Sequence, residues 1–266
     1  MPVIRYPLSV IHWRLASWSG VTLLELLVVL IIIGLLATAA VRTWDVTLEK
    51  GRYEETIKEL EEIARSIVGD ERIRVMGERV DFGFVGDCGM LPRNLIDLSN
   101  RPEYVDTGLW RGPYIKATFA ENPRSFLFDA WGDSYVYNSE SLFIRSFAGQ
   151  AQEYGRGLTK KIGNQPADFL NNTVSGYVED AYGNRPTKGV SLYIIYPWQG
   201  RLRKDSAVFE PHRPGQFAFS PIPQGKVRLI SVLRDTVTRE SIDRYITVYP
   251  KVGKTDLVVR FNSIFP

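Results

Sequence analysis

The sequence has few of the residues on which enzyme active sites depend. Its 266 residues include one cysteine, Cys88, and two histidines, His12 and His212. A single cysteine excludes an internal disulfide framework and any metal site built from several thiolates. A nucleophilic Cys88 would need a histidine as its base, and beyond residue 20 the chain has only His212. We therefore expect no catalysis at Cys88.

Sequence motifs of catalysis are missing as well. No Gly-rich phosphate loop follows a predicted strand, and neither His-x-x-x-His nor Gly-x-Ser-x-Gly occurs. Pairs of carboxylates such as Asp129 and Asp133, or Asp81 and Asp87, could act as acid and base in a hydrolase. Aspartate is also a common turn residue, which is the simpler interpretation here. We expect a protein that is not an enzyme.

Charge is distributed unevenly along a chain of otherwise globular composition. Residues 21–172 contain 17 Lys and Arg against 22 Asp and Glu, whereas residues 173–266 contain 14 against 8. A basic C-terminal part can attract nucleic acid or anionic lipid. Because no Lys/Arg cluster is interleaved with aromatic residues, we favour a solvated surface and do not expect nucleic acid as a partner. A DNA-binding role is an alternative that rests on this charge alone.

One long apolar run dominates the N-terminal part. From Val21 to Val41 the only ionisable side chain is that of Glu25. At ~1.5 Å per residue, a helix over this run can cross a hydrocarbon core ~30 Å thick. A carboxylate near the end of such a helix needs a partner or a place at the interface. If a peptidase cut after Gly20, the new amino group of Val21 would lie about one helical turn from Glu25, and that of a neighbouring subunit could pair with it.

The residues GVTLLELLVVLIIIGLLATAA, which begin at Gly20, resemble the processing site and helix of type IV prepilins and type II secretion pseudopilins. In these families a Gly precedes the cut and a Glu is fifth after it. The resemblance implies cleavage between Gly20 and Val21 by a prepilin peptidase, N-methylation of Val21, and assembly through Glu25. The chain departs from the families in having Val21 where Phe is usual, and in the length of its 20-residue leader.

An ordinary signal peptide or signal anchor is the alternative interpretation of this segment. It too has a basic start, here Arg5 and Arg14, followed by an apolar core. It does not need a glutamate at the head of that core, and its cleavage normally follows the apolar segment. We therefore expect residues 1–20 to be a prepilin leader, whose positive charge holds the N-terminus in the cytoplasm.

The helix is expected to continue beyond the membrane. Residues 21–68 should form one long helix, membrane-spanning in 21–41 and amphipathic thereafter, with Gly69-Asp70 as its stop. Apolar residues recur mostly every three or four positions in its second half, namely Trp44, Leu48, Tyr53, Ile57, Leu60, Ala64 and Ile67. Gly34 and Gly51 each weaken a helix by ~1 kcal/mol relative to Ala, so bending at either is conceivable.

Residues 69–160 are expected to form a small α+β globular region. Four segments resemble, in order, those of the major-type pseudopilins of type II secretion: Gly86-Asp87-Cys88-Gly89, Pro92 to Leu98, Trp110-Arg111-Gly112-Pro113-Tyr114 and Asp129 to Tyr135. Strand-like runs follow at 135–137 and 142–144. An antiparallel sheet of three strands, covered by the amphipathic helix, would complete a pilin fold.

The resemblance implies a calcium-binding loop after these strands, and the sequence departs from it. Pseudopilins of this type tend to have an Asp- and Gly-rich loop with hard oxygen ligands. In this chain residues 149–161 contain only one carboxylate, Glu153, together with Arg156, Lys160 and Lys161. Asp129 or Asp133 could contribute a ligand. We expect no cofactor and no metal site.

The C-terminal part reads as a separate β-sandwich. Residues 161–172 have loop composition and are expected to be a linker. From 173 to 266, short β-runs at 174–178, 190–196, 216–220, 226–233, 242–248 and 255–261 alternate with turns, which predicts six or seven strands. The segments Val174 to Gly183, Pro186 to Leu192 and Gly215 to Val227 are similar to prealbumin-like or carboxypeptidase regulatory-like domains, which implies binding or spacing.

These features predict a structural subunit of a type IV pilus or a type II secretion-like filament. It would assemble through residues 21–68 with other pilin-like subunits and display residues 173–266. The resemblance implies a prepilin peptidase and an inner-membrane assembly platform as partners. It also implies a single pass of the bacterial inner membrane, with the C-terminus outside the cytoplasm, before assembly into a periplasmic or extracellular filament. The alternative is a membrane-anchored adhesin or binding protein that never polymerises.

Overall fold

A long helix opens the described part of the chain. The computed structural model describes residues 22–115, 124–149, 157–186, 188–207, 209, 212–234 and 239–265. Helix α1 covers Leu23–Val68 and continues through both Gly34 and Gly51. The predicted helix, 21–68, ends at the same residue, where Gly69 follows with a φ of 84°. The chain divides into two compact units between Lys50 and Gly51.

Only the last turns of α1 are covered. Leu60, Ile63, Ala64 and Ile67 are buried, whereas Trp44, earlier in the predicted apolar stripe, is 68% exposed. A spacing of three and four places these four buried residues on one face of a helix. The predicted stripe is therefore a packing face only near its C-terminal end.

The region after α1 is built from short elements on this face. A hairpin of β1 (Arg74–Val75) and β2 (Glu78–Arg79) precedes α2 (Gly83–Cys88) and the 3₁₀ turns η1 (Leu95–Leu98) and η3 (Ser125–Leu127). Strands β3 (Val136–Asn138), β4 (Phe143–Ser146) and β5 (Leu158–Lys161) form an antiparallel sheet in the order β3-β4-β5. The expected sheet of three strands is thus present.

This sheet and α1 share one hydrophobic core. Leu142 and Ile144 are fully buried, in one cluster with Ile63 and Ile67 of the helix. The Tyr135 hydroxyl donates to Glu59 Oε2 (2.6 Å), which joins the sheet side to the helix. The pKa of Glu59 is raised above its ordinary value, mainly because the carboxyl group is partly buried; the hydrogen bond from Tyr135 lowers the pKa but does not cancel this effect. We call residues 51–161 the head.

Residues 161–172, expected to be a linker, are packed against their surroundings. Helix α3 (Ala167–Leu170) lies within them, and Phe169 is buried in the same core as α1. The Phe169 carbonyl oxygen accepts the backbone N–H of Gln224 (2.7 Å), far along the chain. The segment therefore connects the head to the C-terminal strands by contacts as well as by sequence.

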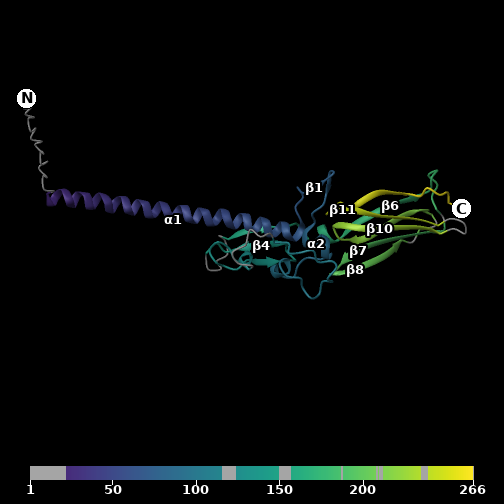
Figure 1. Ribbon diagram of the computed structural model, residues 1–266, viewed down its shortest axis with the longest axis horizontal. Helices are drawn as coiled ribbons and strands as arrows, with labels where there is room; N and C mark the ends of the chain where they lie inside the picture. The colour runs from purple at the N-terminus through teal and green to yellow at the C-terminus, as the bar shows by residue number, and fades with distance from the viewer. Residues whose placement is uncertain are drawn as a thin grey trace, which may run out of the picture. The chain divides into compact units, whose positions relative to one another are not determined.

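Seven strands follow and form two sheets around a second core. They are β6 (Asn172–Glu179), β7 (Val190–Trp198), β8 (Arg201–Ala207), β9 (Gln216–Ile222), β10 (Gly225–Arg234), β11 (Arg239–Val248) and β12 (Lys254–Arg260). One sheet has the order β11-β10-β7-β8 and the other β12-β6-β9 (Figure 1). We call residues 172–265 the sandwich.

Alternation along each strand separates the core face from the outer face. In β7, Leu192, Ile194 and Tyr196 are buried, and the residues between them are partly exposed. This is the period of two expected for a strand with one covered face. Strand β8, which the sequence did not predict, is an edge strand whose residues are mostly exposed.

The expected α+β class is confirmed at the level of a long N-terminal helix followed by a β-rich region with several sheets. In the sandwich, β12 runs parallel to β6, whereas the other strand pairs are antiparallel.

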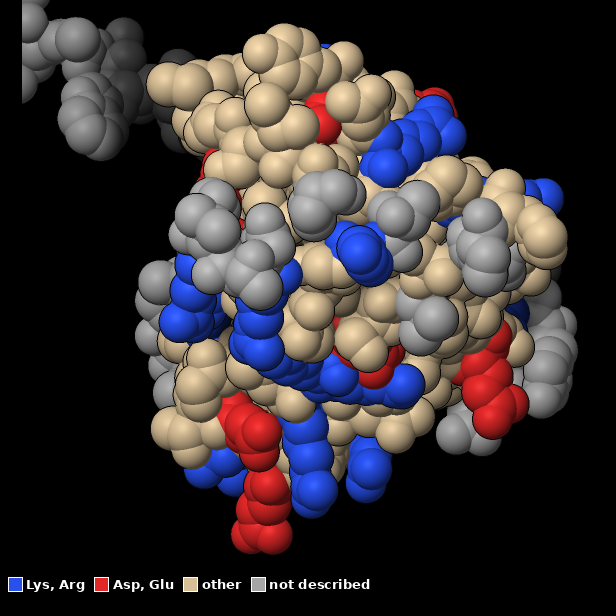
Figure 2. All heavy atoms as spheres, turned by 90° about the vertical axis from the view of Figure 1, so that its right-hand side faces the viewer, with Lys and Arg blue, Asp and Glu red and all other residues tan. Residues whose placement is uncertain are grey.

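Figure 2 shows a face at the C-terminal side of the molecule, where blue Lys and Arg side chains outnumber red carboxylates, as the charge count of residues 173–266 leads one to expect.

Candidate functional site

The N-terminal turn of α1 carries the predicted assembly residue. Thr22 precedes the helix, and its side-chain oxygen accepts the backbone N–H of Glu25 (3.2 Å). The Thr22 carbonyl oxygen accepts the N–H of Leu26 (3.1 Å). A threonine that caps a helix satisfies one of the N–H groups that have no partner within the helix. Glu25 therefore lies in the first turn, where the helix dipole favours a negative charge.

Glu25 is exposed, and its carboxylate has no hydrogen bond or ion pair with any residue that the structure describes. Gly20 and Val21, the predicted processing residues, lie outside the described part of the chain. Among the described residues, the side chain expected to pair with another subunit thus has no partner.

The apolar side chains that follow Glu25 are exposed without interruption. Every residue from Thr22 to Glu55 is exposed, including Leu23 (83%) and Leu35 (68%). The most apolar window of 18 residues has a mean hydropathy of 2.8, and none of it is buried. By length and composition this helix could cross a membrane, a test that a signal sequence also passes.

Close approach to this helix is possible at Gly34. A Cβ atom placed there would meet no other atom within 4 Å. The Thr38 hydroxyl donates to the Gly34 carbonyl oxygen (2.8 Å), so the polar group of Thr38 is satisfied within the helix. Small residues without free polar groups allow helices to pack closely in an apolar environment.

The head and the sandwich meet through backbone hydrogen bonds. Gly200 N–H donates to the Cys88 carbonyl oxygen (2.8 Å), and Gln199 N–H donates to that of Gly89 (3.2 Å). Asp106 N–H donates in turn to the Gly200 carbonyl oxygen (2.8 Å). The turn after Trp198 therefore anchors the sandwich on the head.

A groove of about 530 Å³ lies beside this junction. Its head side includes Phe82, Asp87, Asp106 and Leu109; its sandwich side includes Ile195, Leu202, Lys226, Arg228 and Tyr245. This volume lies in the range of ~300–1,000 Å³ that is common for ligand sites, and such sites are frequent between folded units. Reasoning from sequence missed the groove, because its two sides are separated by more than eighty residues of chain.

Two ion pairs line the groove. Arg111 Nε lies 3.7 Å from Asp87 Oδ1, and the Tyr114 hydroxyl donates to Asp87 Oδ2 (3.0 Å). Burial, the largest cause, raises the pKa of Asp87 above its ordinary value, against the effects of these partners. Arg228 and Asp243 form a bidentate pair on the sandwich side.

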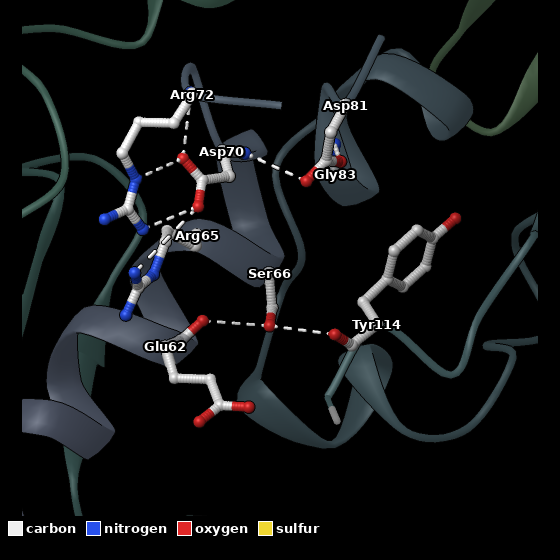
Figure 3. Close-up of a pocket in the computed structure, with 8 residues that line it drawn as sticks. All are labelled: Glu62, Arg65, Ser66, Asp70, Arg72, Asp81, Gly83 and Tyr114. Carbon is white, nitrogen blue, oxygen red and sulfur yellow. Dashed lines mark hydrogen bonds and ion pairs between the residues drawn. The ribbon is translucent and has the colours of Figure 1, made fainter. Parts of the chain in front are cut away.

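A second, smaller pocket of about 240 Å³ lies at the end of α1 (Figure 3). Asp70 accepts two hydrogen bonds from the Arg72 side chain (2.9 and 2.7 Å), which together with the Arg72 N–H hold the pKa of Asp70 well below its ordinary value. Asp81 accepts the N–H groups of Asp70 and Gly83. Ser66 donates to the Tyr114 carbonyl oxygen. These interactions fix the conformation of the segment that directly follows α1.

Asp129, one of the aspartates considered as an acid or a metal ligand, holds a turn together. Asp129 Oδ1 accepts the N–H groups of Trp131 (3.0 Å) and Asp133 (2.9 Å), and the Ser146 hydroxyl donates to Asp129 Oδ2. Glu153 lies outside the described residues. Within the described ranges, no group of three or more His, Cys, Asp or Glu is arranged to hold a metal ion.

Cys88 is fully buried in the head core. Burial, the largest cause, raises the pKa of its thiol to about 12, so the thiol is neutral at physiological pH. The Tyr114 hydroxyl lies 4.0 Å from its sulfur. The arrangement is that of a small apolar core residue.

Comparisons with family models, with curated proteins and with solved structures found no match to this chain.

Proposed function

We propose that the protein is a non-enzymatic, pilin-like subunit of a type IV pilus or a type II secretion-like filament. It assembles through its N-terminal helix and displays its sandwich. The observation that carries this proposal is Glu25, a carboxylate without a partner among the described residues, in the first turn of a helix whose apolar side chains are all exposed from Leu23 to Tyr53. The last turns of the same helix pack on a small antiparallel sheet. This arrangement is compatible with a pilin fold, which the resemblance of the sequence motifs implies.

The exposed apolar side chains of α1 must be covered by lipid or by other helices. Removing one Leu, Ile or Val side chain from water contributes about 1.5–3 kcal/mol, and α1 presents such residues over several turns. Lipid covers them before assembly, with the helix as a single pass of the bacterial inner membrane and the sandwich outside the cytoplasm. Neighbouring helices cover them in the periplasmic or extracellular filament.

Glu25 sets the register between these helices. Burying apolar side chains favours association without fixing how far one helix slides along another. A carboxylate that meets the amino group of Val21 in a neighbour is satisfied at one register only. Buried charge pairs are better at specifying an arrangement than at adding stability. Leader cleavage between Gly20 and Val21 by a prepilin peptidase is needed to create that amino group, and an inner-membrane platform would extract the subunit.

The test compares Glu25→Ala with Asp45→Ala, which removes an exposed carboxylate elsewhere in the same helix. Sheared extracellular filaments are collected, and the mature N-terminus is determined by mass spectrometry. We expect a chain that begins at N-methylated Val21 in both variants, and filament loss only in Glu25→Ala. Filaments at normal yield from Glu25→Ala would remove the pairing argument. An intact leader, or a cut after Ala40, would overturn the proposal.

A membrane-anchored binding protein is the second candidate, and the groove beside the junction favours it. Such a protein would use α1 only as an anchor. It would stay in the membrane fraction and be missing from sheared filaments, whatever residue occupies position 25.

A further inference from the structure

The β1–β2 hairpin presents exposed apolar side chains around its tip. Met76 at its tip is fully exposed (101%), and Val75 (56%) and Ile73 (41%) lie beside it. Met76 and Gly77 both have positive φ, 52° and 84°, as in the tight turns that close two-residue hairpins. Three neighbouring exposed apolar residues on one projection mark a surface that another protein can cover.

The hairpin is held firmly at its base. Arg79, only 3% exposed, donates from its guanidinium to the carbonyl oxygens of Val68 (2.6 Å) and Asp81 (2.7 Å). Glu78 accepts the hydroxyl of Thr247 in β11 (3.2 Å). A two-stranded hairpin by itself is only marginally stable, so these contacts position the tip. A projection ordered beforehand loses little entropy when it binds.

The groove beside the junction offers an apolar surface of matching chemistry. Ile195 and Leu202 line it, and Leu202 is 62% exposed although it is a leucine. Tyr245, 72% exposed, adds an aromatic ring. Covering these side chains removes apolar area from water and favours an apolar occupant.

One pair of opposite charges, Arg74 of the hairpin and Asp106 of the groove, is not neutralised by any described side chain. In the groove, Asp106 has no side-chain hydrogen bond or ion pair among the described residues. On the hairpin, the Arg74 guanidinium donates only to the carbonyl oxygens of Glu71 and Gly77, so no described carboxylate neutralises it. Lys226 also lines the groove, and its strand partner Thr247 donates its hydroxyl to Glu78 of the same chain's hairpin.

We propose that the hairpin tip of one copy of this chain inserts into the groove of a second copy. Met76 and Val75 contact the apolar side of the groove, and Arg74 faces Asp106. The groove begins at Val80, directly after β2. If the hairpin of each copy enters the groove of the next copy, the contact is heterologous and repeats from subunit to subunit. The inference rests on the proposed function and adds to it the contact between globular regions.

Crosslinking between two singly substituted full-length chains tests this contact. Cells produce a Met76→Cys chain together with a Leu202→Cys chain, and membranes and sheared filaments are oxidised mildly. A disulfide requires Cα atoms within ~7 Å, so it reports close approach. Native Cys88 is buried and un-ionised, so it does not compete. We expect a dimer that contains one chain of each kind.

The controls separate contact from chance collision. In the first control, Met76→Cys is produced together with Tyr182→Cys. Tyr182 is exposed (77%), as Leu202 is (62%), but it follows the C-terminal end of β6 and does not line the groove. Each variant is also produced alone. The yield of the Met76–Leu202 dimer should exceed the yield of disulfide-linked dimer in every control. Arg74→Glu should lower its yield roughly tenfold, because like charges at a contact cost affinity, and adding Asp106→Arg should restore it.

The outcomes also distinguish this inference from the proposed function. Filaments seen by electron microscopy without a Met76–Leu202 dimer above the Tyr182 control would overturn the hairpin contact and leave the filament function standing. The dimer without filaments would support the contact and overturn the filament function. An Arg74→Glu chain that crosslinks as well as its parent would overturn the charge pairing.

Discussion

The side-chain amide of Gln224 donates a hydrogen bond to the carbonyl oxygen of Val68, the last residue of α1 (2.9 Å). Gln224 is fully buried in the turn before β10, and the same amide reaches the Phe82 carbonyl oxygen (3.3 Å). The last four carbonyl groups of a helix have no partner within it. The sandwich therefore completes the end of the helix, and the head and sandwich stabilise each other.

Loss of this contact should weaken the whole unit. Gln224→Ala leaves the Phe82 carbonyl oxygen with the Gly86 N–H alone and the Val68 carbonyl oxygen with Arg79 alone; the two lost hydrogen bonds together contribute about 1–3 kcal/mol. We expect a free energy of unfolding lower by about that amount in urea denaturation of the full chain. Gln216→Ala, on the exposed side of β9, is the matched control. Equal stability of the two variants would contradict a stabilising role for the amide.

Gly89 should tolerate no side chain. Its φ is 64°, and a Cβ atom would lie 2.1 Å from the Pro197 carbonyl oxygen, which is backbone at the junction. Gly183→Ala is the control, because that glycine has a φ of 83° and nothing within 4 Å. Gly183→Ala should cost ~1–2 kcal/mol for its left-handed backbone. Gly89→Ala should cost about 1–3 kcal/mol beyond that in the same denaturation assay, because its Cβ atom overpacks the junction. Equal losses of stability in the two variants would show that the backbone at the junction moves to make room for the Cβ atom.

The Asp70–Arg72 pair should make stability depend on acid pH. Hydrogen bonds from Arg72, the largest cause, lower the pKa of Asp70 below its ordinary value of 3.8. A carboxyl whose pKa is lower in the folded chain stabilises the fold above the unfolded pKa, and this contribution is lost as the pH falls through the folded pKa. Asp70→Asn should therefore destabilise the protein at pH 7.

The same variant should differ less from the parent chain as the pH falls below about 4, the ordinary range for aspartate. Urea denaturation at pH 7 and pH 3 measures the two differences. Glu103→Gln, an exposed glutamate, is the control and should show no such convergence. An Asp70→Asn difference that stays constant between the two pH values would contradict the role assigned to the pair.

Local features of the sequence predicted the helix and most of the strands. The lack of charge after Glu25 and the glycine at position 69 set the limits of α1, whose end at Val68 was predicted. Six of the seven sandwich strands overlap predicted runs. Strand β8 was missed because its sequence, RLRKDSA, is charged and does not alternate; as an edge strand it needs little apolar surface.

The tertiary structure alone decided how the parts meet. Glu25 and the apolar run could be recognised from neighbouring residues, because helix length and hydropathy depend on local composition. The contacts of Gln224 with Val68 and of Gly89 with Pro197 join residues more than a hundred positions apart. No periodicity in the chain encodes such pairs. The packed junction, the groove and the firmly held hairpin follow from the fold that brings these distant segments together.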